Sequence, residues 1–254
     1  MGDRVLLLRL EAPLQSWGIR AHWDVRDSAR EPTKSGVVGL LAAALGYSRD
    51  DPRIGGELDA GLRMGVRAER EATLLDDYHT VTDFLPIAKG GYKHSGVRTA
   101  ARLDSLVGNP EVEPSTIQSR RRYLADGAFL VALAASREAP AGLLGRCAEA
   151  LSSPHWPLFL GRRACVPTRP VLDVLSDGYD SLEHALEQHP WSCLSADGLP
   201  GVGARGPARE LRVIIEVNDG AARDDRRLPG REGLYGRRYV REYLVSAPST
   251  AKEA

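Results

Sequence analysis

The sequence predicts an α+β domain built on a split β-α-β unit of the ferredoxin-like kind. Buried strands are predicted at Val5–Leu10, Leu62–Glu69 and Ala128–Ala135, because these runs are apolar or alternate between apolar and polar residues. A mostly apolar helix between Arg30 and Gly46 separates the first two strands, and Ala141–Leu151 has helical spacing. Strand, helix, strand, insertion, strand and helix is the element order expected of that fold.

Length, charge and cysteine spacing limit the class of protein. A chain of 254 residues with no net charge is long enough for one large domain or two small ones, and it has no bulk field to coat nucleic acid. No apolar run reaches the roughly 18 residues that a membrane span needs, so a cytoplasmic protein is expected. Three widely spaced cysteines without a C-x-x-C pair predict neither a disulfide framework nor a metal site, and no cofactor is expected.

The helix between Arg30 and Gly46 carries the first candidate site. Thr33 and Ser35 are suited to cap its free N–H groups, and Gly46 is suited to end it. Its one charge, Lys34, lies at the N-terminus, where the helix dipole favours anions. The sequence therefore predicts an anion site here, and the alternative is an ordinary buried helix with a solvated lysine.

Two polar loops are predicted to converge on this helix tip. The loop Glu11–Gly18 offers Gln15, Ser16 and Trp17 to a nucleobase, although Trp17 could instead cover the edge of the core. The loop His22–Glu31 contains Arg26 and Arg30 and leads directly into the helix.

Arginine clusters occur at three places in the chain, namely Arg120–Arg122, Arg162–Arg163 and Arg237–Arg238. Arginine favours bidentate phosphate contacts and stacking on bases. The alternative for each cluster is a solvated face paired with nearby carboxylates.

The segment from about Asp83 to Arg122 is rich in Gly, Lys and Arg and has little periodicity, so it is predicted to be an inserted flexible arm. In the last third of the chain, Ser181–His189 is predicted to form a short helix and Leu211–Val217 a strand. An arginine-rich stretch at Asp224–Val245 is predicted to contain another strand, followed by a disordered tail.

Two groups of residues could support metal-free RNA cleavage: Tyr78 with His79, and Tyr92 with Lys93 and His94. Such a reaction needs a base, an acid and a cation at the phosphorane. Neighbours in an extended segment point to opposite sides, so stacking and phosphate contact are the favoured use of these residues. The TKSG segment at Thr33 lacks the upstream glycines of a P-loop, which excludes nucleotide hydrolysis.

Five segments in order, LRLEAPLQSWG, PTKSGVVGLLAAALG, DYHTV, RRRYLADGAFLVAL and WPLFLGRRAC, resemble one family. It is the CasD-type CRISPR-associated proteins of subtype I-E, which belong to the RAMP superfamily. The resemblance covers Val5 to about Leu172, and more loosely Leu228–Val245. It implies a ferredoxin-like (RRM-like) RAMP core with an inserted extended thumb and a smaller C-terminal β-rich part. The implied division is 1–82 with 123–172 as the core, 83–122 as the thumb, 173–245 as the C-terminal region and 246–254 as the tail.

The resemblance also implies a role. The chain would be a non-catalytic subunit of the Cascade complex that grips the 5′ handle of the crRNA and caps the backbone filament. Its other partners would be a neighbouring backbone subunit, the large subunit and, through the assembled complex, target DNA, with no membrane. The residues predicted to contact RNA are Gln15, Ser16, Trp17, Arg26, Arg30, Thr33, Lys34, Ser35, Tyr78, His79, Thr80, Arg120, Arg121, Arg122, Tyr123, Arg162 and Arg163. Two alternatives stay open: a metal-independent endoribonuclease that processes precursor crRNA, and a structural subunit that touches only protein.

Overall fold

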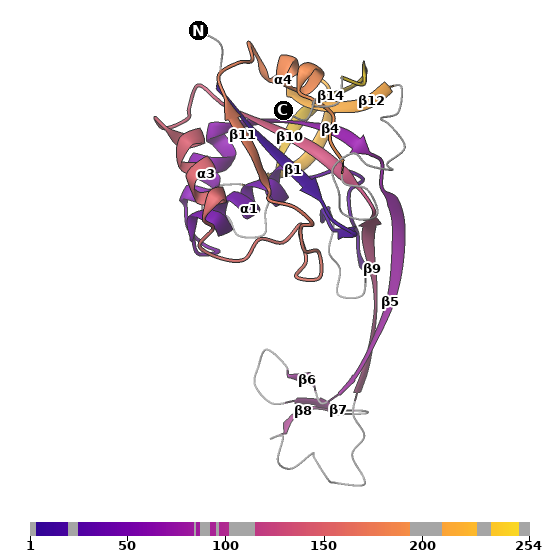
Figure 1. The fold of residues 1–254 in the computed structure, drawn as a ribbon. Helices are drawn as coiled ribbons and strands as arrows, with labels where there is room; N and C mark the ends of the chain where they lie inside the picture. Colours follow the sequence, from indigo (N-terminus) through magenta and orange to yellow (C-terminus); the bar gives the residue numbers. More distant parts are fainter. Residues whose placement is uncertain are drawn as a thin grey trace. The chain divides into compact units, whose positions relative to one another are not determined.

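The computed structural model describes residues 4–19, 25–83, 85–86, 92–94, 97–101, 115–193, 210–227 and 235–248 (Figure 1). The chain divides into two compact units. The first comprises Met1–Ile19, Asp27–Leu75 and Tyr123–Ala254, and the second comprises Arg20–Arg26 and Asp76–Arg122. The region 173–245, which the sequence separates from the core, belongs to the first unit.

A seven-stranded antiparallel sheet organises the first unit, with the strand order β11-β1-β10-β4-β12-β14-β13. The predicted strands are confirmed as β1 (Val5–Glu11), β4 (Leu62–Arg70), β10 (Ala128–Ala135) and β12 (Glu210–Val217). The others are β11 (Leu172–Ser176), β13 (Ala221–Arg227) and β14 (Tyr235–Ser246). The last three strands of the chain extend the sheet from β4, since Ile214 pairs with Val66.

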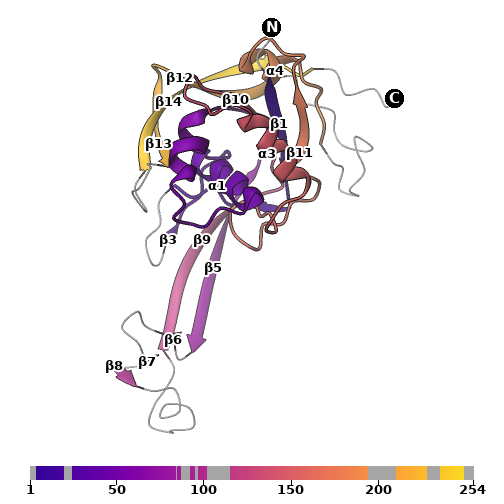
Figure 2. The same ribbon diagram turned by 90° about the vertical axis from the view of Figure 1, so that its left-hand side faces the viewer.

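Three helices cover the two faces of this sheet (Figures 1 and 2). Helices α1 (Lys34–Leu45) and α3 (Leu143–Ser152) lie together on one face, and α4 (Leu182–Gln188) packs on the other. Caps fix α1 locally, because the Thr33 hydroxyl accepts a hydrogen bond from the Gly36 N–H and Gly46 adopts a left-handed conformation. The three predicted helices are therefore confirmed: α1 lies within the expected stretch Arg30–Gly46, and α3 and α4 match their predictions to within two residues at each end.

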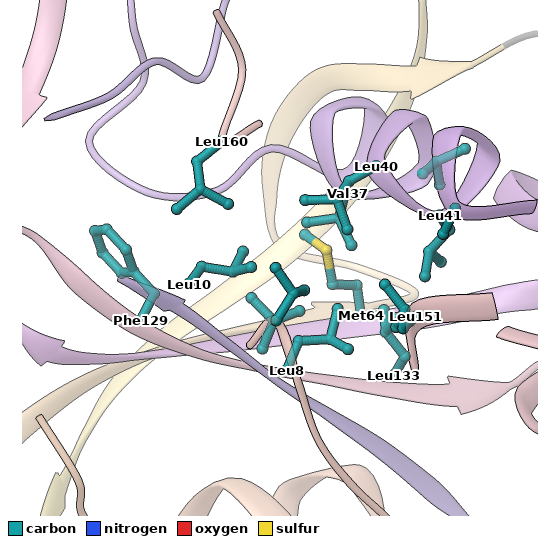
Figure 3. Packing of buried hydrophobic residues seen from close by; sticks show 14 of the residues in the cluster. Leu8, Leu10, Val37, Leu40, Leu41, Met64, Phe129, Leu133, Leu151 and Leu160 are labelled. Atoms are coloured by element: carbon teal, nitrogen blue, oxygen red, sulfur yellow. The ribbon is translucent and has the colours of Figure 1, made fainter. Parts of the chain in front are cut away.

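Burial on both sides explains why β1 is apolar throughout. Leu8 and Leu10 pack under α1 with Met64 and Phe129 (Figure 3), whereas Leu7 faces α4. Apolar strands covered on both faces lose the alternation that marks a half-exposed sheet.

Arg9 is the polar exception in β1, and it ties the α4 segment to the sheet. Its guanidinium donates to Asp173 at 2.7 Å and to Glu69 at 3.1 Å. His189 contacts the same Asp173 oxygen at 2.8 Å. Burial alone would raise the pKa of Asp173, but the hydrogen bond from His189 and the charge of Arg9 lower it to about 2.

The second unit contains long paired strands where the sequence predicts an arm without periodicity. β5 (Thr73–Asp83) pairs with β9 (Ser115–Ala125), and β3 (Val25–Arg26) runs parallel to β9. A separate sheet joins β6 (Leu85–Pro86), β7 (Tyr92–His94) and β8 (Val97–Ala101). This unit begins at Asp76 rather than at the expected residue 83, and β5 ends at Asp83.

The remaining expectations concern the cysteines, the membrane and the tail. Cys147, Cys165 and Cys193 are buried free thiols, and burial raises the pKa of Cys193 to about 12. None of the helices in the described ranges is long and apolar enough to cross a membrane. In the expected tail, Ser246 ends β14, and residues 249–254 lie outside the described ranges.

Candidate nucleic-acid interface

The loop after β1 is a buried structural element rather than a set of exposed base contacts. The short strand β2 (Leu14–Gln15) pairs with the end of β9. The Gln15 amide donates to the carbonyl oxygens of Gly127 at 2.7 Å and Leu10 at 3.2 Å, and it accepts from the Trp17 indole at 3.0 Å. Both side chains are buried, so the prediction that Gln15 and Trp17 meet a nucleobase is wrong for this structure. Trp17 instead covers the edge of the core.

The turn at Gly161 is held against this loop by an unusually close approach. The Ser16 N–H donates to the Leu160 carbonyl oxygen at 3.0 Å, and Ser16 is itself buried. A Cβ at Gly161 would overlap the Ser16 carbonyl oxygen, and Gly161 has a φ of +103°. Only glycine fits both constraints, so the two residues that follow are placed by backbone geometry.

The side chains of Arg162 and Arg163, which follow this turn, have different surroundings. The Arg162 guanidinium lies 4.5 Å from the centroid of the Tyr123 ring, and Tyr123 is buried near the end of β9. Arg163 is exposed. The stacking fixes Arg162 at the surface of the first unit, in an orientation from which a guanidinium can bind a phosphate.

The tip of α1 is already occupied by the chain's own carboxylates. The Lys34 N–H donates to Asp225 at 2.9 Å, and the Lys34 ammonium pairs with Glu216 at 3.0 Å. Lys34 is only 2% exposed. Asp225 also accepts from Arg238 at 2.6 Å, and although burial opposes it, this hydrogen bond holds the pKa of Asp225 below its usual range.

The prediction of an open anion site at this tip is therefore wrong, and so is the alternative of a solvated lysine. Thr33 is buried as the helix cap, and Ser35 is half-buried beside it. Arg30, three residues before the cap, is exposed. Asp225 is 191 residues from Lys34, so sequence spacing carried no signal of this pairing.

Arginines on neighbouring strands come together within the second unit. In the parallel pair of β3 and β9, Arg26 lies opposite Arg121 and Val25 lies opposite Arg120. Residues directly opposite each other project from the same face, and like charges placed so destabilise a sheet. A buried Nε of Arg121 has no hydrogen-bond partner among the residues that the structure describes.

A phosphate bound at this pair of strands would screen the charge of the neighbouring guanidinium groups. Arg120 is exposed one residue before, and Arg122 donates to Asp76 at 3.0 Å. The four predicted arginines of the second unit thus lie on two adjoining strands.

The residues predicted from the DYHTV segment lie on β5. Tyr78 is 59% exposed, which leaves its ring open for stacking. His79 contacts Asp77 at 3.2 Å, and Thr80 is exposed. Tyr78 and His79 are adjacent in a strand, and adjacent side chains point to opposite faces.

The alternative cleavage group is only partly described. Tyr92, Lys93 and His94 form β7, and their side chains lie outside the described part of the structure. Among the described residues there is no cluster of three or more His, Cys, Asp or Glu side chains that could hold a metal ion.

Comparisons with known proteins agree on one class. A family model described as "CRISPR-associated protein (Cas_Cas5)" matches residues 5–245. The "CRISPR system Cascade subunit CasD" of Escherichia coli (strain K12) is 32% identical over 229 residues, which is 86% of this chain and 93% of that protein.

Solved structures give the same result. One described as "Crystal structure of Cas protein" has a TM-score of 0.64 and 32% identity, covering 96% of this chain and 98% of that one. A chain of a "CRISPR RNA-guided surveillance complex" has a TM-score of 0.66 and 28% identity, covering 96% and 91%. The mixed fold and the matched length define a CRISPR-associated protein. Within that class, the chain belongs to the Cas5 family.

Proposed function

We propose that this protein is a crRNA-binding subunit of a Cascade-type surveillance complex of subtype I-E, and that it holds the 5′ handle of the guide RNA. The observation that carries the proposal is the gathering of Arg26, Arg120, Arg121 and Arg122 on the adjoining strands β3 and β9. The 32% identity to a Cascade subunit supports the choice of complex.

The proposed RNA contacts are narrower than those expected from the sequence. They comprise residues that are exposed, half-buried or stacked, namely Arg26, Arg30, Tyr78, His79, Thr80, Arg120, Arg121, Arg122, Arg162 and Arg163. Guanidinium groups would hold phosphates while Tyr78 stacks on a splayed base, which is the usual way single-stranded RNA is recognised. Gln15, Ser16, Trp17, Thr33, Lys34 and Tyr123 are buried and Ser35 is half-buried, so these residues are not among the proposed contacts.

We assign the core to the ferredoxin-like class. The order β1, α1, β4, β10, α3, β11 repeats the β-α-β-β-α-β pattern of that class, and the four strands are consecutive in the sheet. The thumb of the proposed subunit corresponds to the second unit.

The proposed protein partners of the whole subunit are a neighbouring backbone subunit and the large subunit. The subunit would meet target DNA through the assembled complex.

We infer that the subunit is non-catalytic. The support is the separation of the candidate acid and base: adjacent residues Tyr78 and His79 leave β5 on opposite faces, whereas cleavage needs both at one phosphate.

The test uses the full chain and labelled guide RNA with and without its 5′ handle, in a metal chelator. We expect intact RNA and handle-dependent binding. Arg26→Gln and Arg121→Gln should each weaken binding and reduce the salt slope by about 0.7 for each phosphate that the variant no longer binds. Arg146→Gln is the matched control, because this arginine is exposed, pairs with Glu57 at the surface and lies outside the proposed contacts, so the salt slope should stay unchanged.

The outcomes separate the three candidate roles. Handle-independent binding in the chain and in the reconstituted complex would overturn the proposal, and a salt slope unaffected by either arginine variant would favour a purely structural subunit. A discrete cut within the repeat would make the protein a processing ribonuclease. His79, Tyr92, Lys93 and His94 would then be the first residues to replace.

A further inference from the structure

On one face of the sheet in the first unit, α4 covers only part of the surface among the residues that the structure describes. Leu182, Ala185 and Leu186 of α4 cover Val213 and Ile215 of β12. In register beyond β12, β14 places Arg241 opposite Ile215 and Tyr239 opposite Val217. These residues of β14 therefore continue the face that α4 covers, but they are exposed.

The uncovered part of β14 alternates tyrosine and arginine at every second position. Tyr235, Arg237, Tyr239, Arg241 and Tyr243 share this face, since side chains alternate along a strand. Tyr235 is 46% exposed and Tyr239 is 39% exposed. On the edge strand β13, the residue opposite Tyr239 is Ala222, which is itself exposed and too small to cover the ring.

The opposite face of the same strand has a different composition and role. Arg238 is buried and donates to Asp225 at 2.6 Å, and Val240 is buried beside it. Between Tyr235 and Arg241, the buried side chains of β14 are thus the even-numbered Arg238 and Val240. Burial does not account for the rings of Tyr235 and Tyr239 at the surface on the odd-numbered side, whereas Arg241 lies 5.6 Å from the centroid of the Tyr243 ring.

The charges of this face favour an anionic ligand over its first four positions. Arg241 forms no ion pair with any residue in the described ranges, and Arg237 has only an exposed pair with Asp224 at 3.0 Å. Such exposed pairs contribute little and exchange readily. At the far end, burial and the nearby Glu187 and Glu183 raise the pKa of Tyr243 to about 12, so phosphate is disfavoured there.

We propose that Tyr235, Arg237, Tyr239 and Arg241 form a second RNA-binding surface, which takes single-stranded RNA without reading its sequence. Alternate residues of a strand are about 6.7 Å apart, which suits successive side chains to successive nucleotides of an extended chain. Tyrosine rings stack on any base, and the arginines bind phosphates between them. The surface is distinct from the proposed handle contacts and rests on the proposed function only for the choice of RNA.

The test measures binding of the full chain to a fluorescent 15-nucleotide oligouridine without a handle. Tyr239→Leu keeps a strand-forming apolar side chain but removes the aromatic ring, and we expect it to weaken binding roughly 10-fold. Arg241→Gln should weaken binding and lower its salt dependence. Tyr239→Phe, which keeps the ring, should bind as the wild type does. Leu244→Ala is the matched control, because Leu244 is exposed on the opposite face of the same strand.

A cross-linking measurement places the RNA independently of affinity. With 4-thiouridine in the oligonucleotide, we expect cross-links to the peptide that contains Tyr235 and Tyr239. Unchanged affinity in the double variant Tyr239→Leu with Arg241→Gln would overturn the proposal. Loss of complex assembly with RNA affinity intact would also overturn it, because the face would then bind a protein partner. Equal weakening of RNA binding by Leu244→Ala would overturn it as well. A negative result for this surface with handle-dependent binding intact would leave the proposed function standing.

Discussion

Two groups of arginines in this protein have the same side chain and opposite surroundings. In the first unit, Arg238 pairs with buried Asp225, and Arg226 pairs with buried Asp59. In the second unit, Arg26 and Arg121 face each other across β3 and β9, and the Nε of Arg121 has no hydrogen-bond partner in the described part of the chain.

The difference separates arginines that build the fold from those available to a ligand. Arg238 is buried and bidentate with Asp225, and Arg226 donates one N–H to buried Asp59, so these donors are directed to carboxylates of the chain itself. Guanidinium groups in register on neighbouring strands repel each other, and a bound phosphate would offset that repulsion. The sequence shows arginine clusters in both places, and only the pairing distinguishes them.

Removing the Asp225 carboxylate, which pairs with Arg238 of the first group, should have the largest effect on stability. Asp225→Ala leaves Arg238 charged and buried without a partner, and it uncaps the Lys34 N–H. We expect the free energy of unfolding to fall by about 3–5 kcal/mol, measured by urea denaturation. Asp224→Asn is the control, because its pair with Arg237 is exposed and should change stability by less than about 0.5 kcal/mol. Equal effects of the two variants would contradict the comparison.

The next largest effect is expected at the turn that presents Arg162. Gly161→Ala forces a Cβ against the Ser16 carbonyl oxygen at a φ of +103°. We expect a loss of about 3 kcal/mol in unfolding free energy and weaker RNA binding, because the turn must move. Gly39→Ala, on an open face of α1, should not destabilise the protein. A turn variant as stable as the wild type would show that this approach does not fix Arg162.

Acid should remove a smaller, defined contribution from Asp173. Its folded pKa is about 2 against an ordinary value of 3.8, so the ionised form stabilises the native state. That stability is present above pH 4 and is lost as the pH falls toward 2, and it amounts to about 2 kcal/mol. Asp173→Asn should be less stable at pH 7 and show a flatter pH dependence of urea unfolding between pH 4 and pH 2. An unchanged slope would mean that Arg9 and His189 do not hold this carboxylate ionised.

The smallest change in stability is expected in the second group. Arg121→Gln removes one of two facing charges, so the free energy of unfolding should change by less than about 0.5 kcal/mol. Handle RNA affinity should nevertheless fall by about 10-fold, measured by fluorescence anisotropy. A destabilisation comparable to that of Asp225→Ala would place Arg121 among the structural arginines.

Local signals in the sequence were sufficient for most of the first unit. Thr33 and Gly46 bound α1 as their capping chemistry predicts, and the apolar runs of β1 and β10 are strands. The sequences of β5 and β9 contain no comparable signal of their long pairing. Their side chains are mostly exposed on both faces, so no hydrophobic period marks them.

The candidate site was less predictable because its decisive contacts are distant in the chain. The Trp17 ring and Gln15 amide satisfy each other in the interior, which a polar, aromatic loop sequence does not reveal. The partners of Lys34 lie more than 180 residues away. Arg26 and Arg121 meet only because two strands are paired in a particular register.

The distance between Lys34 and its carboxylates also affects how the protein is made. A ribosome releases the apolar α1 and the strands beneath it long before Glu216 and Asp225 emerge. Until then, the edge of β4 that pairs with β12 is open. The nascent chain therefore exposes an unpaired sheet edge during synthesis, which is the kind of surface that makes folding intermediates prone to aggregate. A product cut short before β12 would keep that edge exposed.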